Sequence, residues 1–90
     1  MNANEVQYQL NLLLEQLQPI INAYDYQAAV RYMDAREYTL TFEHLCEQLY
    51  EFQTPISPVI YDRLESLGLA LGYTDMSHWQ ELQPQVVARA

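Results

Sequence analysis

The chain has 90 residues, half of them apolar, and twelve acidic residues outweigh four basic ones to give a formal charge of −8. A chain of this length and composition folds as one globular domain with a single core. The negative charge argues against nucleic acid and anionic membranes as ligands and favours a basic partner, although acidity can also serve solubility alone.

Cysteine usage and the N-terminal sequence indicate the compartment. Cys46 is the only cysteine, so an intramolecular disulfide is impossible, and a lone thiol within an apolar pattern fits a reducing environment. The first ten residues have no basic region and no long apolar run. We therefore expect a cytoplasmic protein without a signal peptide or a membrane span.

The first predicted helix starts near Asn4, whose side chain suits an N-cap with Gln7 as its capping-box partner, and it ends or kinks at Pro19. Its leucine-rich stripe is too short for a convincing coiled coil, so we expect it to form core. The residues expected to be buried here and just after Pro19 are Val6, Leu10, Leu13, Leu14, Leu17, Ile20, Ile21 and Tyr24.

A second helix is predicted from an N-cap at Asp25 to about residue 35, and a third over residues 37–52. The link between them is short, which makes the two helices antiparallel neighbours. The second helix should face inward with Tyr26, Ala29, Val30 and Met33. The third carries one continuous apolar stripe, with Cys46 on its flank, formed by Tyr38, Phe42, Leu45, Leu49 and Phe52.

The fourth helix has the clearest boundaries: Ser57 is its predicted N-cap, Pro58 occupies its first turn, and Gly72 closes its C-terminus. Within it, Gly68 should permit the close approach of another helix. A last short helix capped by Asp75 or Ser77 should reach Leu82 and end at Pro84, with Trp79 as a core plug over the end of the bundle. The predicted fold is therefore all-α, a small single-domain bundle of four main helices plus a short C-terminal helix, over residues 1–90.

The sequence offers few groups for catalysis. His44 and Cys46 are two residues apart on a helix, so their side chains diverge by about 200° and cannot form a nucleophile–base pair. Glutamates at Glu-x-x-x-Glu spacing could bind a metal in principle, but no second helix offers matching ligands. No glycine-rich phosphate loop is present either. We expect no enzymatic activity, no cofactor and no metal.

The acidic side of the third helix is the most informative feature. Glu43, Glu47 and Glu51 follow one another at intervals of four residues, and no lysine or arginine in the stretch relieves their repulsion. Apolar residues set among carboxylates resemble an interface in which charges steer a basic partner toward an anchor. The alternative is that these apolar residues pack against other helices. The predicted partner-binding residues are Asp34, Glu37, Leu40, Glu43, Glu47, Tyr50 and Glu51.

Part of the chain, about residues 26–73, resembles Maf-type immunity proteins, including those of contact-dependent growth inhibition systems. The segments that carry the resemblance are residues 28–38, residues 45–51 with the Pro-Ile-Ser of residues 55–57, and the Tyr…Leu-Gly pattern of residues 61–72. Arg36 stands where many members have a glycine. The motifs consist mostly of helix-packing and capping residues.

The resemblance implies an immunity protein that binds and neutralises the C-terminal domain of a polymorphic bacterial toxin. It implies a ribonuclease toxin of the EndoU type and a monomer that forms a one-to-one complex with it. A nuclease holds polyanionic RNA on a basic surface, where an acidic protein can dock. The alternatives are an acidic helical adaptor or secretion chaperone that binds a client segment, and a metalloprotein or enzyme.

Overall fold

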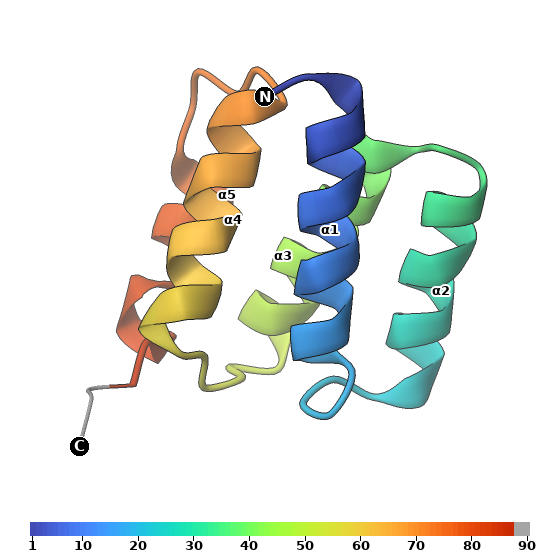
Figure 1. Ribbon diagram of the computed structural model, residues 1–90. Coiled ribbons are helices and arrows are strands. Elements are labelled where there is room, and N and C mark those ends of the chain that lie inside the picture. Colours follow the sequence, from blue (N-terminus) through green and yellow to red (C-terminus); the bar gives the residue numbers. More distant parts are fainter. Residues whose placement is uncertain (88–90) are drawn as a thin grey trace.

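Residues 1–87 form four long helices and two short helical turns (Figure 1). The computed structural model describes residues 1–87, so the last three residues of the predicted domain lie outside it. The elements are α1 (Ala3–Leu17), α2 (Ala23–Asp34), α3 (Tyr38–Glu51), α4 (Pro58–Ala70), α5 (Ser77–Gln80) and a 3₁₀ turn, η1 (Gln83–Gln85). The predicted all-α fold of four main helices and a short C-terminal helix is confirmed.

The bundle is arranged around α1 and α3. Figure 1 shows α1 standing between α4 and α2, with α3 behind it, and α2 packs along α3 as the short link between them predicts. The radius of gyration is 12.1 Å, close to the ~12 Å expected for a compact chain of this length. Within residues 1–87, no helix is long and apolar enough to cross a membrane.

The starts of α1, α2 and α4 carry side-chain caps, whereas α3 and α5 have none, and the starts of α1 and α2 lie earlier than predicted. Asn2 rather than Asn4 caps α1, accepting a hydrogen bond from the backbone N–H of Glu5 at 2.9 Å. Asn22 rather than Asp25 caps α2: its Oδ1 accepts a hydrogen bond from the backbone N–H of Asp25 at 2.8 Å, and its Nδ2 donates to the Asp25 carboxylate at 2.6 Å. The predicted Ser57 cap of α4 is confirmed.

Three helices end in the same way. After α2, α3 and α4, one residue adopts a positive φ: Arg36 (58°), Gln53 (50°) and Gly72 (93°). In each case this residue and the next donate their N–H groups back to the last turn of the helix, which is the Schellman arrangement. A left-handed position favours glycine, and only Gly72 meets that preference.

The core confirms the predicted helical stripes over most of their length. Val6, Phe42 and Leu64, from three different helices, are buried in one cluster. Three residues predicted to be buried are exposed instead, namely Ile20, Tyr24 (77%) and Phe52 (60%). Tyr24 falls in the first turn of a helix that starts earlier than expected, and Phe52 is the residue that follows the last turn of α3.

The C-terminal segment closes the end of the bundle. Trp79 of α5 is fully buried, as the sequence predicts, and its ring lies against Gly68 of α4. Gln85 is buried in η1, where its side-chain amide donates to the carbonyl oxygens of Leu49 at 2.7 Å and Thr54 at 3.0 Å. Pro84 lies inside this 3₁₀ turn. The segment is therefore fixed to the end of α3 and holds α5 beside it.

Candidate functional site

The outward side of α3 exposes two large apolar side chains. Leu40 is 45% exposed and Tyr50 is 47% exposed, although both lie on a helix whose other side is core. The interpretation in which they pack against neighbouring helices is therefore wrong. Glu47 and Glu51 beside them are exposed as well.

A groove of about 300 Å³ runs between α3 and α5, and we call it the acidic groove. Three carboxylates line it, from Glu47, Glu51 and Glu81, and among residues 1–87 no lysine or arginine does. Its remaining lining residues are Cys46, Tyr50 and His78. The groove therefore joins part of the predicted site to a second element.

Three of these lining residues were not predicted as site residues, namely Cys46 of α3, His78 and Glu81. His78 and Glu81 come from α5 and the residue that follows it, more than 25 positions along the chain from α3. Their spacing of three residues on a helix was the available signal, because it places both side chains on one face. Nothing in the local sequence indicates that this face meets α3.

Glu43 differs from the other two glutamates of α3. It is half-buried and accepts a hydrogen bond from the hydroxyl of Tyr73, which lies in the loop between α4 and α5. Burial, followed by this bond to Glu43, raises the pKa of the Tyr73 phenol well above its ordinary range. Glu43 thus ties α3 to the loop that leads into α5, and it supports the groove instead of lining it.

Asp34 and Glu37 are exposed but lie apart from the acidic groove. Asp34, at the end of α2, lines a different depression between α1 and α2 that also includes Glu15. Glu37 precedes α3 and makes no side-chain capping bond. The predicted acidic patch is therefore not one continuous surface: Glu47, Tyr50 and Glu51 are brought together, while Asp34 is not among them.

His44 and Cys46 take structural positions. The Nε2–H of His44 donates to the backbone carbonyl of Asp25 at 2.9 Å and so ties α3 to α2. Cys46 is only 2% exposed, and burial, with further contributions from Glu43 and Glu47, raises the pKa of its thiol well above the ordinary value of 9.0. A protonated thiol is a poor nucleophile. Among residues 1–87, no three histidine, cysteine or acidic side chains are placed to hold a metal ion.

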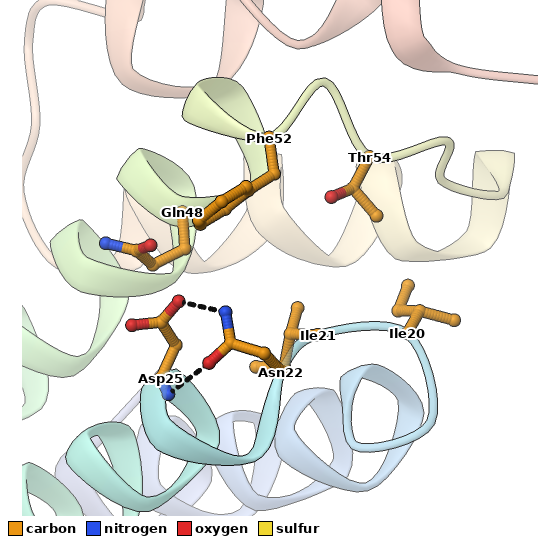
Figure 2. A pocket seen from close by; sticks show the side chains of 7 residues that line it. All are labelled: Ile20, Ile21, Asn22, Asp25, Gln48, Phe52 and Thr54. Carbon is orange, nitrogen blue, oxygen red and sulfur yellow. Dashed lines mark hydrogen bonds between the residues drawn. The ribbon is translucent and has the colours of Figure 1, made fainter.

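A second depression, also about 300 Å³ in volume, lies between the loop after α1 and the end of α3. Figure 2 shows the Asp25 carboxylate and the Asn22 amide on the α2 side, across from Gln48 of α3 and from Phe52, which follows that helix. Most of the surface exposed in its wall belongs to apolar atoms, although four of the seven lining residues are polar, and we call it the apolar cleft. Its lining residues are Ile20, Ile21, Asn22, Asp25, Gln48, Phe52 and Thr54.

No family model matches this chain, and neither does any curated protein or solved structure. The case for a function therefore depends on the geometry of these surfaces and on the sequence resemblance described above.

Proposed function

We propose that this protein is a cytoplasmic immunity protein that binds and neutralises the C-terminal ribonuclease domain of a polymorphic or contact-dependent bacterial toxin. The observation that carries the proposal is the acidic groove, where Glu47, Glu51 and Glu81 line the same space as the exposed Tyr50, with no compensating cation among the lining residues within residues 1–87. The resemblance to Maf-type immunity proteins supplies the kind of partner.

The arrangement suits a stoichiometric inhibitor. Carboxylates without cations among them project negative potential, which accelerates the encounter with a basic surface. An aromatic side chain that shares a groove with such carboxylates is a common kind of binding anchor, and burying it slows dissociation. A ribonuclease that holds an RNA backbone presents the complementary surface, so the acidic groove would occupy the place of phosphate groups.

The test is to purify the protein with the toxin domain encoded immediately upstream of its gene and to measure RNA cleavage with and without it. We expect a one-to-one complex that abolishes cleavage. A folded protein that neither binds that domain nor slows cleavage would overturn the proposal.

Two matched triple variants then test whether the acidic groove is the surface that steers binding. Replacing Glu47, Glu51 and Glu81 together by glutamine should slow association at low salt by about tenfold and flatten its salt dependence. The control replaces Glu5, Glu15 and Asp62 by their amides, which removes the same charge from exposed positions outside the groove. Equal association rates for the two triple variants would show that net charge, and not the groove, steers binding.

A second candidate function is an adaptor or secretion chaperone that binds a client segment. The apolar cleft favours it, because exposed side chains such as Ile20 and Phe52 could receive an apolar residue of an extended client. This candidate predicts binding to a peptide segment without inhibition of any nuclease, so the cleavage assay separates the two.

A further inference from the structure

One of the two histidines of the chain lies in the wall of the acidic groove. His78 of α5 is half-buried there, and its ring meets the ring of Tyr73 in a T-shaped contact with centroids 4.7 Å apart. The Tyr73 hydroxyl donates in turn to Glu43 of α3. These contacts hold the imidazole at the wall of the groove.

The groups around His78 include carboxylates and no cation. Within residues 1–87, no lysine or arginine lines the groove, and α4, which also packs against α5, meets it through Gly68 and contributes no charged side chain to the lining. Burial raises the pKa of the Cys46 thiol and of the Tyr73 phenol, so both stay protonated near neutral pH. The titratable groups that share the groove with His78 or lie beside it are Cys46, Glu47, Tyr50 and Glu51 on α3, Tyr73 and Asp75 in the loop before α5, and Glu81 after α5.

Protonation of His78 would change the charge of this groove. Imidazole is the side chain whose charge ordinarily changes between about pH 5 and 8. A proton on His78 places a cation among the carboxylates and cancels one of their negative charges. A basic partner in the groove then meets a like charge, and the repulsion weakens its binding. Because protonation and partner binding oppose each other, a bound partner also makes His78 harder to protonate.

We propose that His78 makes the acidic groove a pH-sensitive docking surface, which holds a basic protein partner more tightly when the imidazole is neutral than when it is protonated. The inference rests on the proposed function in that it concerns the regulation of the same groove. His44 provides the comparison within the chain, because its Nε2–H donates to the backbone carbonyl of Asp25 on the α2 side and it does not line the groove. Protonation of either histidine raises the net charge equally, so a difference between the two reports on position.

The test measures how tightly the full chain binds an N-acetylated, C-amidated hexa-arginine peptide at pH 6 and at pH 8, at one low ionic strength. The peptide carries the same charge at both pH values. We expect amide NMR shifts at Glu47, Glu51 and Glu81, and an affinity about fivefold lower at pH 6 than at pH 8. An affinity that does not fall at pH 6, or a peptide that leaves the groove unshifted, would overturn the inference.

Two matched variants assign the effect to one histidine. In His78→Gln the affinities at the two pH values should agree within about twofold, whereas His44→Gln should keep the difference of about fivefold. A His78→Gln variant with the pH dependence of the parent would show that other groups carry it. The Hε1 resonance of His78 gives a second measurement without any variant: saturation with the peptide should lower the pH at which this resonance shifts. An unchanged titration curve would contradict the linkage.

The toxin domain takes no part in these measurements, so the inference and the proposed function fail separately. Inhibition of RNA cleavage without a pH effect on peptide binding removes only the role of His78. A pH effect that depends on His78, without inhibition of the toxin domain, removes the immunity function and leaves a pH-sensitive surface for basic peptides.

Discussion

Gly68 of α4 and Trp79 of α5 are in closer contact than any other residue type at position 68 would allow. A Cβ atom at Gly68 would lie 2.1 Å from Cζ3 of the Trp79 ring, well inside contact distance. The indole fills the space that a side chain would need, and this brings α5 against α4. The position of α5 in turn sets one wall of the acidic groove, because His78 flanks Trp79 in the chain.

We predict that Gly68→Ala destabilises the domain by about 1–3 kcal/mol, because the added methyl group displaces the ring. Alanine is otherwise the better helix former by about 1 kcal/mol. The measurement is urea unfolding together with the emission of the single tryptophan, which should shift to the red as α5 moves. In a Trp79→Leu background the same substitution should cost little. Purely additive effects of the two substitutions would show that the contact does not limit position 68.

The sequence predicts only part of the contact between Gly68 and Trp79, and the same limit applies to other contacts between distant residues. Periodicity indicates that Gly68 faces inward and that Trp79 is core, since both follow from local pattern. The bond between Tyr73 and Glu43 spans 30 residues, and that between Gln85 and Leu49 spans 36. Such pairings depend on how the helices pack, which local periodicity does not specify.

The same limit explains the residues predicted wrongly. Phe52 continues the apolar stripe of α3 in sequence, but the helix ends at Glu51 and the following residue leaves the helical path. The stripe was extended one residue too far. Thr41, in contrast, is fully buried although it is polar. Its hydroxyl donates to the backbone carbonyl of Glu37 at 2.8 Å, a bond that offsets the cost of burial.

We predict that Glu43→Gln destabilises the domain by about 1 kcal/mol, because the charge-assisted bond from Tyr73 is weakened. The exposed Glu47→Gln serves as the control and should stay within about 0.5 kcal/mol of the parent. The measurement is a double-mutant cycle of Glu43→Gln with Tyr73→Phe under urea unfolding. If the two substitutions contribute independently, the hydrogen bond is not a stabilising tie. From the sequence alone, relief of the repulsion among Glu43, Glu47 and Glu51 predicts that replacing all three by glutamine leaves the fold intact. The hydrogen bond from Tyr73 predicts instead that the replacement of Glu43 is destabilising.

We predict that the stability of the domain falls on the alkaline side partly because of Cys46. Its folded-state pKa is raised above the ordinary value of 9.0, so its contribution is complete below pH 9 and is lost as pH rises above it. One such proton changes the free energy of unfolding by about 1.4 kcal/mol per pH unit. Urea unfolding at pH 7.5, 9 and 10 should show a shallower loss in Cys46→Ala than in the parent. Native protein should also resist iodoacetamide until it is unfolded, and rapid alkylation of the folded chain would contradict the burial of this thiol.

We predict that Arg36→Gly raises the free energy of unfolding by about 0.5 kcal/mol. Arg36 has a φ of 58° at the end of α2, where a residue with a side chain is strained by roughly 1 kcal/mol. Glycine removes this strain, but it also raises the entropy of the unfolded chain, which offsets part of the gain in stability. The hydrogen bonds from Arg36 N–H to Met33 and from Glu37 N–H to Tyr32 do not involve the side chain and should persist.

The matched control is Gly72→Ala, which introduces a Cβ at a φ of 93° with open space around it. It should lower stability by about 1 kcal/mol through backbone strain alone. Because both positions close a helix by the same pattern of hydrogen bonds, the two substitutions should have opposite signs, and equal signs would mean that something other than backbone conformation dominates at position 36.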